Sequence, residues 1–161
     1  MSGRRTPPRR VLLLGTLPQR RHRATPVSDP SIRLISISRR VAGQLDAAGV
    51  PHTPSQVYFH ADAWTGLHNA VSQTVEALAH HRNDTPPAAW LDDWSHLLGA
   101  ELCDAFYWTR VAEQVLCRER PSQVLLQRVR ASDPTFAALA ALRSAFEVLG
   151  SACADWRPAR S

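Results

Sequence analysis

Positions 85–119, TPPAAWLDDWSHLLGAELCDAFYWTRVAEQVLCRE, carry the strongest secondary-structure signal in the chain. Thr85 can cap a helix whose first turn contains Pro86 and Pro87, because the N–H groups that proline lacks have no helical partner there. The segment therefore predicts one long amphipathic helix, of about 50 Å at 1.5 Å per residue. Its apolar face consists of Trp90, Trp94, Leu97, Ala105, Trp108, Ala112 and Val115.

The length of this helix sets it apart from its neighbours. The helices predicted beside it have about 20 residues, or about 30 Å. Either the long helix bends or breaks, or one of its ends projects beyond the others. Gly99 falls on the polar side of the helix, where close packing does not call for a glycine. We therefore expect a kink or a split near Gly99.

Two further amphipathic segments precede the long one. The segment 28–49 opens on the helix-start signal Ser28-Asp29-Pro30 and closes on Gly49, a typical left-handed stop. Within it, only 32–38 is ambiguous between helix and strand. The apolar face of 28–49 carries Leu34, Ile37, Val41, Leu45 and Ala48. The apolar face of the second segment, 62–82, carries Trp64, Leu67, Val71, Val75 and Leu78.

Two shorter helices are predicted after the long one, on either side of Ser132-Asp133-Pro134. Pro121 begins the first, and the second runs over 134–149 and stops at Gly150. The apolar residues of the first are Val124, Leu125 and Val129. Those of the second are Phe136, Leu139, Leu142, Phe146 and Leu149.

These elements predict an all-α fold, a four- to five-helix bundle with a disordered Arg-rich N-terminal tail. Amphipathic helices of similar length with short connections are typical of bundles. We expect three parts: a disordered basic leader at 1–27, a helical bundle domain at 28–155 and a frayed C-terminus at 156–161.

Charge is unevenly distributed along the 161 residues. Residues 1–27 contain seven arginines and no acidic residue, whereas residues 28–161 contain twelve arginines and fourteen acidic residues, so +7 and −2 give the net charge of +5. All nineteen basic residues are arginine, a bias that indicates a high-GC bacterium. The hydrophobic fraction of 44% excludes a fully disordered chain. No apolar run approaches the roughly 18 residues of a membrane-spanning helix.

Metal, disulfide and phosphate-binding motifs are missing from the sequence. Cys103, Cys117 and Cys153 are odd in number and widely spaced, which argues against a disulfide framework or zinc ribbon and fits a reducing cytoplasm. No Glu-x-x-His pair is present, and of the histidines only His68, with His60 as a second candidate, is well placed to face the interior, so we expect no metal. Glycine-rich phosphate loops and nucleophile motifs are absent as well. We therefore expect no cofactor and disfavour an enzyme.

One polar constellation falls on the predicted core. Glu101 lies at the centre of the long helix's apolar face, His68 on the inner half of 62–82, and Arg143 beside the apolar residues of 134–149. A carboxylate facing a core must be paired or protonated, because desolvating a lone charge is costly. We expect Glu101 to meet His68 or Arg143. The contact is either a satisfied structural pair or part of a ligand pocket between helices.

Three functions stay open at this stage. The first is a non-enzymatic interaction or regulatory module, acting on a protein partner or as a homodimer. The second is a nucleic-acid-associated accessory factor, whose leader attracts phosphates. The third is a ligand- or metal-binding helical-bundle enzyme with a pocket around Glu101 and His68. In the nucleic-acid-associated factor, the phosphate-binding residues would be the seven arginines of the leader, Arg4, Arg5, Arg9, Arg10, Arg20, Arg21 and Arg23.

Overall fold

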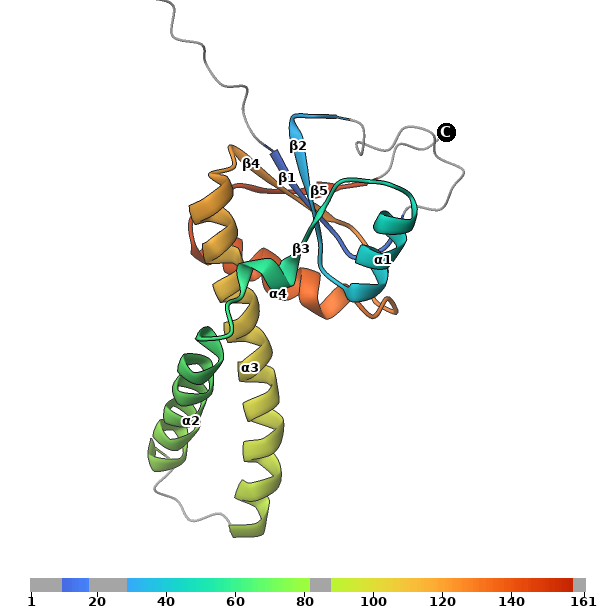
Figure 1. The fold of residues 1–161 in the computed structure, drawn as a ribbon. Coiled ribbons are helices and arrows are strands. Elements are labelled where there is room, and N and C mark those ends of the chain that lie inside the picture. The colour runs from blue at the N-terminus through green and yellow to red at the C-terminus, as the bar shows by residue number, and fades with distance from the viewer. Residues whose placement is uncertain (1–9, 18–28, 82–87, 158–161) are drawn as a thin grey trace, which may run out of the picture.

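The fold is α/β and is built on a five-stranded parallel sheet (Figure 1). A computed structural model describes residues 10–17, 29–81 and 88–157, and outside 78–98 it also describes their side chains. The strands are β1 (Arg10–Leu14), β2 (Ile32–Ser36), β3 (Thr53–Pro54), β4 (Gln123–Gln127) and β5 (Cys153–Trp156). The helices are α1 (Arg39–Ala47), the 3-10 helix η2 (Ser55–Tyr58), α2 (Ala63–His81), α3 (Ala88–Glu119) and α4 (Phe136–Val148). The strand order is β3-β2-β1-β4-β5.

The prediction of an all-α bundle is therefore wrong. Strands covered on both faces are continuous apolar runs rather than alternating patterns, and so they resemble short buried helices. The segment after Pro121, predicted as a helix, is β4, with the sequence QVLLQ. The ambiguous patch at 32–38 contains β2, and the helix that follows it, α1, is correspondingly short.

The predicted leader contributes the central strand of the sheet. β1 pairs with β2 on one side and with β4 on the other, and the four residues Val11–Leu14 are buried. The described residues 10–17 are therefore not a disordered tail. At the other end of the chain, Trp156 belongs to β5 rather than to a frayed terminus.

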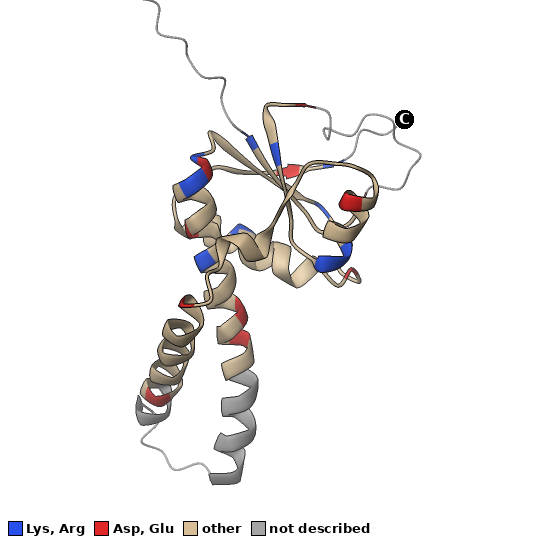
Figure 2. Cartoon of the chain, viewed as in Figure 1, with Lys and Arg blue, Asp and Glu red and all other residues tan. Residues whose placement is uncertain are grey.

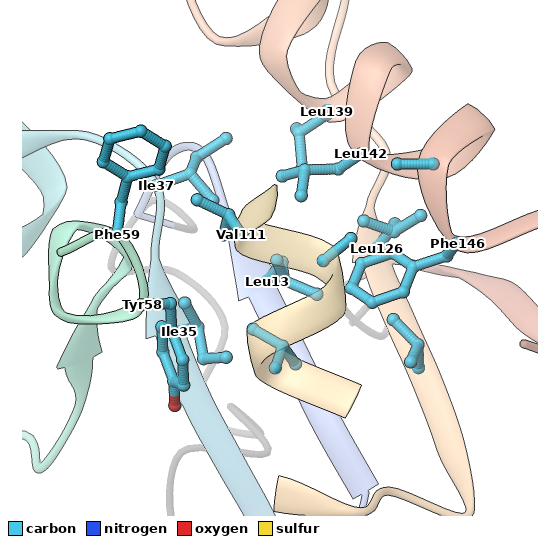
Figure 3. Close-up of a cluster of buried hydrophobic side chains, with 14 of the residues drawn as sticks. Leu13, Ile35, Ile37, Tyr58, Phe59, Val111, Leu126, Leu139, Leu142 and Phe146 are labelled. Atoms are coloured by element: carbon cyan, nitrogen blue, oxygen red, sulfur yellow. The ribbon is translucent and has the colours of Figure 1, made fainter. Parts of the chain in front are cut away.

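Helices cover both faces of the sheet. α1 packs on one face, where Val41 and Leu45 contact the leucines of β1, β2 and β4. η2, α3 and α4 pack on the opposite face and build the larger cluster, which holds Val111, Leu142 and Phe146 (Figure 3). Figure 3 shows α4 and the base of α3 converging on the middle of the sheet. This core fixes the positions of the loops at the strand ends.

Two helix ends follow the sequence signals. Gly49 after α1 and Gly150 after α4 have φ angles of 67° and 75°, in the left-handed region that favours glycine. The backbone N–H groups beyond each stop close back on the preceding turn, as Val50 does on the carbonyl of Leu45. Both stops are confirmed.

The predicted split of the long helix is wrong, because α3 is a single helix from Ala88 to Glu119. α3 pairs with α2, and the two stand away from the sheet as a helical hairpin (Figure 1). One end of α3 therefore projects, which is the alternative to a bend or a break that the length of the helix left open. Among residues 63–77 and 99–109 the charged side chains are all acidic, namely Glu76, Glu101 and Asp104 (Figure 2). None of the described helices is both long and apolar enough to cross a membrane.

Candidate ligand site at the carboxyl edge of the sheet

The strand order places a topological switch point between β1 and β4. The chain leaves β1 toward β2, on one side of the sheet, and leaves β4 toward β5, on the other. The connections therefore diverge where the carboxyl ends of β1 and β4 lie side by side. In open parallel sheets, ligands bind in the crevice beyond the carboxyl ends of the strands at such a point.

The side chain of Gln127 occupies this switch point. Its Oε1 accepts hydrogen bonds from the backbone N–H groups of Gly15 and Thr16, both at 2.8 Å. Its Nε2 donates to the Thr16 carbonyl at 2.9 Å and to Thr16 Oγ1 at 3.2 Å. The Gln127 amide thus satisfies donors that could otherwise face a ligand.

The loop after β1 is also packed tightly against the start of α4. Asp133 Oδ1 accepts from the N–H and the hydroxyl of Thr135, at 2.8 and 2.6 Å, which fixes the turn before α4. A Cβ added to Gly15 would lie 2.9 Å from Thr135 Cβ and 3.0 Å from Leu139 Cδ1. Only a glycine fits between these two loops, so the switch point itself is closed.

A groove opens beside the closed switch point, between α4 and the carboxyl ends of β4 and β5. Its volume is about 550 Å³, within the roughly 300–1,000 Å³ that is typical of small-molecule sites. The lining residues come from the end of β4 and the following loop, from α4 and from β5. They are Leu126, Gln127, Arg128, Val129, Ala131, Phe136, Leu139, Ala140, Arg143, Ser144 and Asp155.

The groove has an apolar floor and one charged end. Leu126 and Leu139 of the floor are buried, whereas Phe136 stands half-exposed at the rim. At the charged end the Asp155 carboxylate pairs with the Arg143 guanidinium, and Arg128 Nη1 lies 3.9 Å from Asp155 Oδ2. Two cations and one anion leave one net positive charge on the lining.

Strand alternation explains why Asp155 lies in the groove. Side chains on β5 alternate between the sheet faces, and Ala154 and Trp156 pack with the α1 face. Cys153 packs with the opposite cluster, so Asp155, two residues further, lies on the α4 side. Burial raises the pKa of the Cys153 thiol, partly opposed by the positive charge of Arg143, so this thiol stays protonated near neutral pH.

The structure does not build the predicted cluster of Glu101, His68 and Arg143. Glu101 is exposed on α3 and His68 is exposed on α2, where its ring lies beside that of Trp64. Arg143 lies on α4 and pairs with Asp155 instead. The expected burial assumed a bundle that covers the long helix all along its length. Here α2 covers the part of α3 that lies farther from the sheet, and α4, η2 and the sheet cover only the end nearest to the sheet (Figure 1).

Of the seven predicted phosphate-binding arginines, the structure describes Arg10. Its guanidinium pairs with Asp29 at 2.9 Å and donates to Ser31 Oγ at 3.3 Å, at the start of the sheet. Arg10 is therefore engaged within the chain. The others, Arg4, Arg5, Arg9, Arg20, Arg21 and Arg23, lie outside the described residues. Among the residues that are described, no group of three or more potential metal ligands converges.

Sequence motifs do not mark Gln127, Arg128 and Asp155 as site residues. A signal was available, because Gln127 and Arg128 directly follow the apolar run of β4. Once that run is recognised as a parallel strand, its polar carboxyl end becomes a candidate site. Asp155 could be found only after β5 had been placed next to β4.

A second polar cluster lies at the opposite, amino edge of the sheet. The Tyr58 hydroxyl donates to Glu119 Oε1 at 2.7 Å, and Arg33 Nε lies 3.2 Å from Glu119 Oε2. Burial and the adjacent carboxylate raise the pKa of Tyr58 to about 12. Because the cluster joins η2, β2 and the end of α3, we assign it a role in stability.

Comparison of the chain with known protein families, with curated proteins and with solved structures finds no match.

Proposed function

We propose that this domain binds a small organic molecule in the groove between α4 and the carboxyl ends of β4 and β5. The observation that carries the proposal is the groove itself, about 550 Å³ in volume and adjacent to the switch point. An apolar floor with a few convergent polar groups is typical of small-molecule sites, in which the apolar part contributes affinity and the polar groups orient the ligand. The lack of catalytic motifs favours binding over catalysis.

Filling the groove is expected to abolish binding there. Ala140 lies on the groove side of α4 and is exposed, so Ala140→Trp places an indole in the cavity. Ala137 is equally exposed on α4 but does not line the groove, which makes Ala137→Trp a matched control. Using benzyl alcohol as an uncharged probe, we expect amide shift changes in two-dimensional NMR spectra to cluster on α4 and β4. They should disappear in Ala140→Trp and persist in Ala137→Trp.

Two results would count against this function. One is that benzyl alcohol shifts no amides around the groove at millimolar concentration. The other is that Ala140→Trp and Ala137→Trp bind the probe equally well.

A second proposed function, self-association, is favoured by the apolar surface at the base of the α2–α3 hairpin, the end of the hairpin nearest to the sheet. Trp64 on α2 is 46% exposed, although its ring stacks on Tyr107 with centroids 5.8 Å apart. An apolar hollow of about 250 Å³ lies at the same base, between α2 and α3. Its lining is Phe59, Ala63, Gly66, Leu67, Phe106 and Arg110. An exposed ring and an apolar hollow on one hairpin are self-complementary, so we propose a second copy as the partner.

Sedimentation velocity tests the pairing of two copies. We expect a dimer with a dissociation constant in the micromolar range, weakened about tenfold or more by Trp64→Ala, because buried tryptophans dominate interface energies. Val148→Ser is the control, since Val148 is an exposed apolar residue on α4, 84% accessible, and does not line the hollow. A chain that stays monomeric above 100 µM (about −5.5 kcal/mol) would exclude this pairing.

A cytoplasmic location is also proposed, on the basis of the unpaired Cys103, Cys117 and Cys153.

A further inference from the structure

We infer that the ligand of the groove carries an anionic group, a carboxylate or a phosphate, and that Asp155 occupies the place of this group when the ligand is absent. The inference rests on the proposed function and names the chemical class of the ligand. Its basis is the arrangement of three charged side chains at one end of the groove.

Two guanidiniums from different elements converge on one carboxylate. Arg143 projects from α4 and Arg128 follows β4, and both face Asp155 on the edge strand β5. Arginine pairs with a carboxylate or a phosphate through parallel N–H donors, so two arginines can hold one anionic group between them. Asp155 uses only part of this capacity, because Arg128 Nη1 is 3.9 Å from its Oδ2.

The pairing with Asp155 is also exchangeable. The side chains of Arg128, Arg143 and Asp155 are 58%, 37% and 43% exposed, so water screens their attraction. Asp155 precedes the last residue of the edge strand β5. A ligand anion that also gains contact with the apolar floor can therefore replace its carboxylate at little cost.

The charged residues that line the groove determine which ligand charge it favours. The lining carries Arg128, Arg143 and Asp155, and Glu147 lies further along α4 and is not part of it. With Asp155 in place the net charge of the lining is +1. With Asp155 neutral or displaced it is +2, which favours an anion more strongly. A cationic ligand would instead face two arginines.

Binding of four probes to the full chain tests the inference. The probes are benzyl alcohol, benzoate, phenyl phosphate and inorganic phosphate, titrated by NMR into the wild type, Arg143→Gln, Asp155→Asn and Arg39→Gln. Arg39 is exposed on α1, which packs on the opposite face of the sheet, and serves as the matched arginine control. We expect benzoate or phenyl phosphate to bind about tenfold more tightly than benzyl alcohol, as charge-assisted hydrogen bonds are stronger than neutral ones. The stronger of the two identifies the anionic group.

The variants give opposite expected changes. Arg143→Gln should weaken binding of the anionic probe about tenfold and leave binding of benzyl alcohol unchanged, because the substitution removes a charge and keeps the apolar floor of the groove. Asp155→Asn should increase the affinity for the anionic probe severalfold, since the side chain that competes with the probe for the two arginines becomes neutral. Arg39→Gln should change neither. Inorganic phosphate should bind more weakly than phenyl phosphate, because it cannot use the apolar floor.

Failure of the inference is distinguishable from failure of the proposed function. If benzyl alcohol binds in the groove but the anionic probes bind no more tightly, the domain keeps a ligand site and the anionic class is wrong. The same holds if Asp155→Asn weakens the anionic probe. If none of the probes shifts amides around the groove, both proposals are wrong. Thermal melts of each variant confirm that the binding changes do not come from unfolding.

Discussion

Replacing Gly15 with alanine is expected to lower the free energy of unfolding by about 2–3 kcal/mol, near the upper end of the usual cost of overpacking a core. The new Cβ would lie 2.9 Å from Thr135 Cβ and 3.0 Å from Leu139 Cδ1, closer than carbon atoms pack. Thr135 cannot turn away freely, because Asp133 holds both its hydroxyl and its backbone N–H. Urea denaturation followed by circular dichroism measures the change.

Two further variants make this result specific. Removing the opposing side chain with Thr135→Gly should recover part of the loss in the double variant, so that the two substitutions are not additive. Gly43→Ala is the control on α1, where a Cβ meets nothing within 4 Å. It should stabilise the fold by about 0.5–1 kcal/mol, because alanine is the better helix former. A Gly15→Ala chain as stable as the wild type would contradict the described packing of the two loops.

Replacing Tyr58 with phenylalanine should destabilise the fold at neutral pH and remove part of its sensitivity to alkali. The lost hydrogen bond to the buried Glu119 is expected to cost about 1–2 kcal/mol. The pKa of Tyr58 is raised to about 12 in the folded chain, against about 10 in the unfolded one. A raised pKa means that the stabilisation is complete below pH 10 and is lost as the pH rises toward 12.

The size of the alkaline effect follows from the same shift. Two pKa units correspond to about 2–3 kcal/mol, an upper value for the stability that the wild type loses across this window. Urea unfolding at pH 7, 9 and 11 should therefore show a smaller loss for Tyr58→Phe than for the wild type. Tyr107→Phe is the comparison variant, because burial also raises the pKa of Tyr107 but no carboxylate contributes to that shift, so this variant should remove less of the alkaline loss than Tyr58→Phe. Equal losses in the wild type and Tyr58→Phe would show that this hydroxyl does not titrate as described.

Helix ends were predictable from the sequence because they depend on local backbone chemistry. Gly49 and Gly150 stop α1 and α4 as their positions indicated. The strands were not predictable in this way. β4 has five residues, of which three in a row are apolar, and such a run is too short to distinguish a doubly covered strand from a helix by periodicity. The segment of β1 reads as part of a basic leader because arginines and prolines flank it, although its own four apolar residues are buried.

The candidate site was less predictable than the helices because it depends on long-range strand pairing. The sequence places Arg143 beside a core face, but its partner, Asp155, comes from a strand that the sequence pattern does not reveal. The sequence predicts Glu101 on a covered face because a helical wheel shows which residues share a face. It does not show what packs on that face, and Glu101 is exposed.

The central position of β1 changes how the basic start of the chain can be trimmed. A shortened chain beginning at residue 28 would keep β2 with β3 and β4 with β5, but would have no strand to join the two pairs. Nucleic-acid affinity lost on such a truncation would report unfolding rather than the removal of charge. Trimming that leaves the sheet whole has to stop before Arg10, whose guanidinium is already paired with Asp29. It removes only Arg4, Arg5 and Arg9, so the contribution of Arg20, Arg21 and Arg23 has to be measured by substitution within the intact chain.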